Sequence, residues 1–214
     1  MADRSARRPL VVQPPEATRS LGARFQIPHL LTRYSERRVW ALFMFLNGFI
    51  TIALLAAVAM VSGTPFVFPS LGPTAFLFFF TPRAPAASPR HTIYGHAIGI
   101  ACGYGALWLF GLEHAPPAMA TGVSVARVGA AALSLASTGA LMILANAAHP
   151  PAGATTLIIS LGIVTRPLHL LVIEIAVAIL TLQAIAINRL ADIDYPAWAL
   201  RTRSVTTKPV AGGS

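Results

Sequence analysis

Two short segments of this 214-residue sequence combine proline, glycine and hydroxyl residues inside apolar surroundings. The first, PSLGPT, covers residues 69–74, and the second, PPAGATT, covers residues 150–156. Proline and glycine interrupt a helix, and the first N–H groups of the helix that restarts have no intrahelical partner. In a membrane these groups need a partner, and the positive end of the helix dipole favours an anion. We therefore predict an anion-binding site at the two breaks, built from Ser70, Gly72, Thr74, Gly153, Thr155 and Thr156.

An alternative interpretation of these residues is purely structural. The four hydroxyl residues would then cap the restarting helices, while proline and glycine would shape tight turns. The occurrence of two similar breaks favours a ligand path, because short glycine- and proline-interrupted segments mark the binding sites of many transporters.

His149 immediately precedes the second break, and Asn146 lies about one helical turn before it. An imidazole at this position could bind an anion, relay a proton or cap the end of the preceding helix. We expect Asn146 to share the same polar pocket. Neither residue has a second histidine or acid at metal-ligand spacing, so we expect no metal site and no cofactor.

Glu174 is the only acid well inside an apolar run. An ionisable group within a membrane is costly and is therefore a candidate functional residue. We predict that Glu174 couples proton movement to transport. The alternative is a structural ion pair with Arg127, Arg166 or a histidine.

The elements that must position these residues are apolar. The chain is 55% hydrophobic and 11% charged, against roughly 25% charged residues in soluble domains. Four runs are long enough to cross a bilayer, which needs about 20 helical residues, and two shorter runs contain the breaks. The long runs are 39–62, 93–112, 126–147 and 168–188, and the short ones are 66–80 and 152–164. The fold class predicted is an all-α transmembrane bundle of six segments.

The charged residues indicate how these segments are oriented. Eight of the sixteen Lys and Arg residues precede Trp40, and four more lie from Arg189 onward. With six crossings and a cytoplasmic N-terminus, the basic loop 81–91 and the C-terminus are also cytoplasmic, as the positive-inside rule requires, and only Arg166 is misplaced. In the alternative, both short segments are re-entrant, and Arg83 and Arg90 then lie outside. Arg127 then lies at an outer helix end, where it can snorkel to the interface.

Six crossings also divide the chain into two inverted halves, 39–112 and 126–188, each with one short broken segment between two long ones. The domain organisation expected is a basic cytoplasmic tail over 1–38, a transmembrane domain over 39–190 and a disordered tail over 191–214.

Small residues recur every four positions in two of the long runs: Gly95, Gly99 and Gly103 in one, and Ala126, Ala130, Ser134 and Thr138 in the other. This spacing lets helix backbones approach closely. It predicts packing between the halves or between subunits, so a homo-oligomer is possible. The partners expected are membrane lipid and a small inorganic anion. The basic residues lie in tails and loops rather than on one folded face, which argues against nucleic acid.

Two longer stretches that contain the breaks, residues 69–96 and 148–156, resemble the HPP family of membrane proteins, which takes its name from a His-Pro-Pro motif. That motif is here His149-Pro150-Pro151, and the resemblance covers about residues 35–190. Chloroplast members of the family transport nitrite. The resemblance therefore implies transport, with nitrite as the leading candidate, and we expect a bacterial plasma (inner) membrane protein with both termini in the cytoplasm.

The predicted function is thus transport of a small anion without enzymatic activity. Two alternatives stay open. An intramembrane enzyme would need a nucleophile and base or a metal constellation. In a structural or sensory membrane protein, the breaks would be simple kinks.

Overall fold

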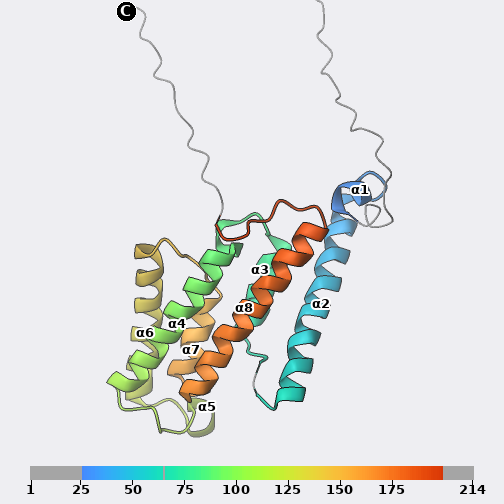
Figure 1. Ribbon diagram of the computed structural model, residues 1–214. Coiled ribbons are helices and arrows are strands. Elements are labelled where there is room, and N and C mark those ends of the chain that lie inside the picture. The colour runs from blue at the N-terminus through green and yellow to red at the C-terminus, as the bar shows by residue number, and fades with distance from the viewer. Residues whose placement is uncertain (1–25, 65, 200–214) are drawn as a thin grey trace, which may run out of the picture.

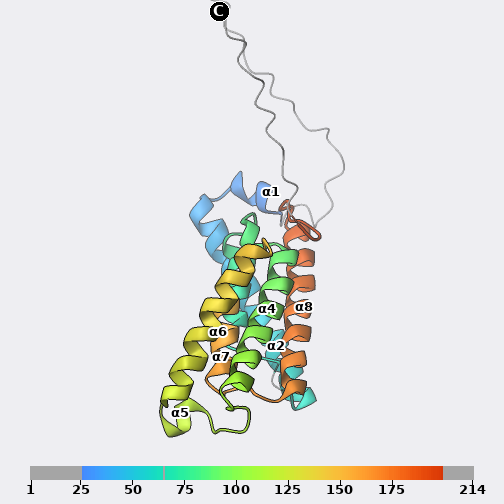
Figure 2. The same cartoon turned by 90° about the vertical axis from the view of Figure 1, so that its left-hand side faces the viewer.

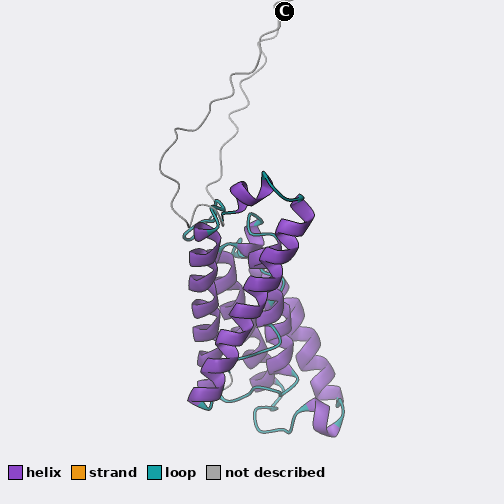
Figure 3. Cartoon of the chain, turned by 90° about the vertical axis from the view of Figure 1, so that its right-hand side faces the viewer, coloured by secondary structure: helices purple, strands orange, loops and turns teal. Residues whose placement is uncertain are grey.

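A computed structural model describes residues 26–64 and 66–199 of the chain. Helices make up its regular structure, and no strand occurs in these residues (Figure 3). The elements, in chain order, are α1 (Ile27–Leu31), α2 (Glu36–Ser62), α3 (Leu71–Phe80), the 3₁₀ turn η2 (Pro85–Ala87), α4 (Pro89–Leu109), α5 (Ala118–Thr121), α6 (Val125–Leu144), α7 (Ala152–Ser160) and α8 (Pro167–Leu190).

The four long helices agree with the predicted apolar runs to within four residues at each end. Proline occupies the first position of α4 and α8, where its missing N–H costs no hydrogen bond. Three helices, α2, α6 and α8, are long and apolar enough to cross a membrane. Helix α4 has 21 residues but is less apolar, because it contains His96 and four glycines.

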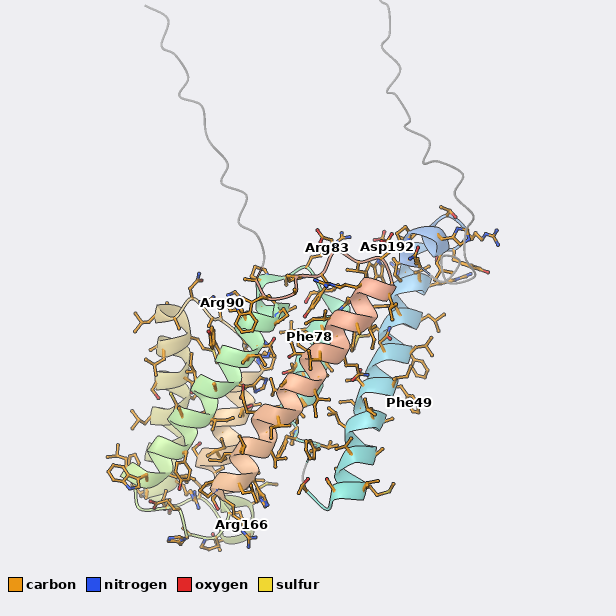
Figure 4. The ribbon with its side chains drawn as sticks, viewed as in Figure 1. Phe49, Phe78, Arg83, Arg90, Arg166 and Asp192 are labelled. Atoms are coloured by element: carbon orange, nitrogen blue, oxygen red, sulfur yellow. The ribbon has the colours of Figure 1, made fainter. Side chains whose placement is uncertain are left out.

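Successive helices alternate in direction (Figure 1). Helices α2, α4 and α7 run from the upper to the lower end of the bundle in this view, and α3, α6 and α8 run upward. Helices α3 and α7 are short and begin inside the bundle, each after a stretch of irregular chain. Arg83, Arg90 and Asp192 lie near the upper end, and Arg166 lies at the lower end (Figure 4).

Helix α4 lies at the centre of one side of the bundle, between α6 and α8 (Figure 2), and it also packs against α7. Its glycines make this contact possible. A Cβ atom added at Gly99 would lie 2.8 Å from the Ala152 carbonyl oxygen, and one at Gly103 would lie 2.9 Å from the Thr156 carbonyl oxygen. The small-residue face is therefore confirmed as a packing surface, and it joins the two halves of the chain.

Helix α2 lies at the edge of the bundle and contacts mainly α3 and α8. Its outward face exposes large apolar side chains, including Phe49, whereas Phe78 of α3 points into the core (Figure 4). An apolar outer face suits a helix surrounded by lipid.

The two ends of the described chain pack against the bundle. The Ile27 N–H donates to the Ala191 carbonyl at 3.1 Å, which joins α1 to the end of α8. Tyr195 is buried, its hydroxyl donates to the Ala87 carbonyl, and burial raises the pKa of this phenol, so it remains a donor. The Arg90 N–H donates to the Trp198 carbonyl at 2.9 Å. The disordered tail expected from residue 191 therefore does not begin there, and residues 200–214 lie outside the described residues.

The prediction that Arg127 snorkels was wrong. Its side chain is buried, and its guanidinium donates to the carbonyls of Ala115, Pro116 and Ser160 at 3.0–3.1 Å. Ser160 is the last residue of α7, so Arg127 caps this helix at its negative end, a position that favours a cation.

Candidate functional site

The two breaks, far apart in the sequence, line one groove. It has a volume of about 580 Å³ and is open to the outside of the bundle. Its wall consists of Gly72, Pro73, Phe76 and Leu77 from α3 together with Pro150, Pro151 and Ala154 from the start of α7. None of these side chains is charged, so the wall of the groove is apolar.

A cluster of buried histidine and threonine side chains lies next to this groove. Thr74 follows the groove residue Pro73, and His149 precedes the groove residue Pro150. The Thr74 hydroxyl lies 2.9 Å from Nε2 of His96 and 3.2 Å from Nε2 of His149. All three side chains are fully buried, and the two imidazole rings are 5.0 Å apart.

The cluster continues on both sides of the two rings. Nδ1 of His96 lies 2.8 Å from the Thr155 hydroxyl, and Nδ1 of His149 lies 2.7 Å from the Ala86 carbonyl oxygen. The Thr92 hydroxyl lies farther from Nδ1 of His149, at 3.5 Å. Hydrogen bonds therefore link α3, α4, α7 and the turn η2 at one buried point.

Gly95 leaves space on α4 for the side chain of His149. A Cβ atom at this position would lie 2.5 Å from Cβ of His149, so only glycine leaves room for the histidine against α4. The cluster thus depends on the close approach of α4 to the chain around the second break.

The backbone at the breaks differs from the prediction. The N–H groups of Ala152, Gly153 and Ala154 already donate to carbonyls of residues 149–151, and the Leu71 N–H donates to the Phe68 carbonyl. Ser70 and Pro151 have helical φ and ψ angles, which extends each first turn backwards. The first N–H groups of α7 that we expected to bind an anion are thus occupied, as is the Leu71 N–H at the start of α3.

The other predicted site residues are placed as follows. Gly72 lines the groove, and the space around its Cα is open. Gly153 faces Leu135 of α6 instead and is not part of the groove wall. Asn146 does not share the pocket, because its side chain is exposed and its carbonyl accepts a hydrogen bond from Arg90. The hydroxyls of Ser70 and Thr156 are buried and have no partner among the described residues.

Glu174 lies on α8, outside the cluster. Both of its carboxyl oxygens are buried, and neither makes a hydrogen bond within the described residues. The structural ion pair considered as an alternative is therefore not present there. A buried carboxyl group without a partner is costly in its charged form.

His96 and Thr92 belong to the cluster, but the sequence analysis did not name them as site residues. A signal was present, because Thr92, His96, Gly99 and Gly103 recur every three or four residues and so lie on one helix face. Polar residues on the same face as the glycines point towards the helix that the glycines contact.

Residues 34–196 match the family described as "HPP, transmembrane region". No curated protein and no solved structure matches the chain. The family match spans most of the chain and includes the groove, the histidine cluster and all four long helices. The chain therefore belongs to the HPP family of integral membrane proteins.

Proposed function

We propose that this protein transports a small anion across the membrane, with nitrite as the leading candidate, and that it is not an enzyme. The observation that supports transport is the meeting of the two broken segments at one groove, beside a buried polar cluster. Broken helices that meet in this way are typical of transporter binding sites. The family resemblance supplies nitrite as the candidate substrate.

We also propose that all six segments cross the membrane and form two inverted halves. The alternating directions of the helices support this topology, because the first half runs down, up and down while the second runs up, down and up. Arg83 and Arg90 lie near the upper end and Arg166 lies at the lower end, and this excess of arginine supports a cytoplasmic location for the upper end. We propose that both termini are cytoplasmic as well. The membrane proposed is the bacterial plasma membrane.

This topology predicts labelling from opposite sides. Thr81 and Thr121 are both exposed, and each hydroxyl bonds the carbonyl four residues earlier, so Thr81→Cys and Thr121→Cys are matched changes. In a background with Cys102→Ala, an impermeant thiol reagent added to intact cells should label only the cysteine at position 121. Labelling of both positions from outside would contradict six crossings.

The apolar wall of the groove restricts how an anion can pass. None of the groove side chains carries a positive charge, and a bare anion in such surroundings is costly. Thr74 and His149 are chain neighbours of the groove residues Pro73 and Pro150, but their own side chains are fully buried. We propose that the anion reaches these polar side chains from the groove and that a positive charge accompanies it.

Glu174 is a candidate for the group that couples protons to transport. Glu174→Gln keeps the shape and removes the ionisation. Because this carboxyl has no ionic partner among the described residues, we expect the variant to keep the parent's melting temperature while uptake falls or loses its pH dependence. Parent-like uptake with an unchanged pH profile would make Glu174 a structural residue.

The function itself is tested by anion flux. Purified protein in liposomes should take up nitrite, measured colorimetrically, faster than protein-free liposomes, which report the leak of nitrous acid through lipid. Nitrate and chloride are the comparison anions. Liposomes that contain folded protein but show only the leak would favour a structural or sensory role over transport.

A further inference from the structure

We infer that Thr155, His96, Thr74 and His149 form a directed hydrogen-bond chain, and that this chain binds the proton that accompanies the transported anion. The inference extends the proposed function, since the anion is the one proposed above. Its structural basis is independent of the anion, because it depends only on which atom donates in each contact.

The direction of the hydrogen-bond chain is fixed at one end by the carbonyl of Ala86. The Ala86 oxygen can only accept a hydrogen bond, so Nδ1 of His149, 2.7 Å away, must carry a proton. In the neutral ring, Nε2 of His149 is then an acceptor. Its partner within the cluster is the Thr74 hydroxyl at 3.2 Å, which donates to it in the arrangement that we infer, while the Ser70 carbonyl at 3.0 Å competes for the same proton.

The rest of the chain follows from the single proton of the Thr74 hydroxyl. Having donated to His149, this oxygen accepts from Nε2 of His96 at 2.9 Å. His96 is therefore protonated on Nε2, and its Nδ1 accepts from the Thr155 hydroxyl at 2.8 Å. In this arrangement each of the four contacts has one donor, one acceptor and one proton between them. In every other arrangement of the four neutral side chains, at least one contact has either no proton or two protons.

A second arrangement becomes available when one proton is added. The Thr74 hydroxyl also lies 3.0 Å from the Ser70 carbonyl oxygen, which can accept its proton. If the hydroxyl turns to Ser70, the lone pair of Nε2 on His149 is free to take a proton, and this new N–H donates to the Thr74 oxygen. His149 then carries one positive charge, beside the groove, and no covalent bond other than the N–H bond has formed.

Among the described residues, no Asp or Glu makes a hydrogen bond to His149 that would neutralise that charge. Besides His96, the ionisable groups around it are His91 and Arg90 of α4, of which Arg90 donates to the carbonyls of Ala145 and Asn146. From the segment after α8, Tyr195 donates to Ala87, next to Ala86. Glu174 makes no hydrogen bond to the cluster. An anion in the groove is therefore the natural counter-ion, and one proton would enter with one anion.

The first test measures which ring nitrogen of each histidine carries a proton, and it does not depend on transport. Nitrogen-15 NMR of labelled histidine in the purified protein distinguishes the two neutral tautomers, and loss of a signal in His96→Gln or His149→Gln assigns it. We expect His149 protonated on Nδ1 and His96 on Nε2. A neutral His149 protonated on Nε2 would reverse the chain and overturn the inference.

The second test measures the coupling between proton binding by the cluster and nitrite transport. Thr74→Val removes the hydroxyl that links the two rings, while Thr74→Ser keeps it. Thr181→Val is the matched control, because Thr181 of α8 is also buried and its hydroxyl also donates to the carbonyl four residues earlier, but it makes no hydrogen bond to the cluster. In liposomes with an alkaline interior, we expect Thr74→Val to lower nitrite accumulation at least tenfold, whereas Thr74→Ser and Thr181→Val should stay within twofold of the parent. Parent-like accumulation in Thr74→Val would overturn the inference.

The two tests separate the inference from the proposed function. If the parent protein carried no nitrite, the proposed function would be wrong for this anion. The tautomers of His96 and His149 would still test the direction of the hydrogen-bond chain. If the parent carried nitrite with no response to the pH gradient, the function would stand and the proton-binding role would be overturned.

Discussion

Gly72→Val is expected to abolish nitrite uptake while leaving the fold intact. A Cβ atom at Gly72 would meet no other atom within 4 Å, and the residue lines the groove. The valine side chain would therefore extend into the open space that the anion must enter, rather than into a neighbouring helix. Uptake into liposomes gives the rate, and size-exclusion chromatography checks the fold.

The matched control for this change is Gly139→Val. Gly139 is also helical, and a Cβ atom there also meets nothing within 4 Å, but the residue is exposed on α6 and lies outside the groove wall. This variant should transport like the parent. Ala154→Val, on the opposite wall, should reduce uptake as Gly72→Val does. Normal rates in both groove variants would show that the anion takes another path.

Gly99→Ala is expected to destabilise the protein by about 1–3 kcal/mol, the usual cost of overpacking a core. The added methyl group would lie 2.8 Å from the Ala152 carbonyl oxygen. A backbone oxygen cannot turn aside as a flexible side chain can, so α4 and α7 would have to separate. The histidine cluster depends on this contact, and uptake should therefore fall together with stability.

Gly105→Ala makes the same change on the same helix where space is open. Alanine favours a helix over glycine by up to about 1 kcal/mol, so this variant should melt at the parent's temperature or slightly above it. Thermal unfolding in detergent, followed by tryptophan fluorescence, compares the two. Equal melting temperatures for Gly99→Ala and Gly105→Ala would mean that α4 and α7 are less tightly packed than described.

The helices could be predicted from the sequence because each depends on local properties. Apolar runs of about 20 residues locate α2, α4, α6 and α8, and the glycine and proline segments locate the breaks before α3 and α7. The glycines at intervals of four correctly predicted a packing face, because that spacing has few other uses.

The site could be predicted only in part, because its residues meet through long-range packing. The sequence marks Thr74, His149 and Thr155 by their places at the breaks, and all three lie in the cluster. Nothing local distinguishes Gly72, which faces the groove, from Gly153, which faces α6. The occupied N–H groups at the start of α7 were also unpredictable, since they depend on the chain bending into a helical turn around Pro151.

The central position of α4 has a consequence for biosynthesis. The helices that α4 contacts most, α6, α7 and α8, all follow it in the sequence, and the last of them ends at Leu190. While the chain is being made, His96 and the glycines of α4 emerge from the ribosome before any of these partners exists. Helix α2 is apolar enough to enter the lipid alone, whereas α4 is less apolar and gains its neighbours later. The core of the protein is therefore completed only after α8 has been made, and a chain truncated after α6 would leave His96 without Thr155 and His149.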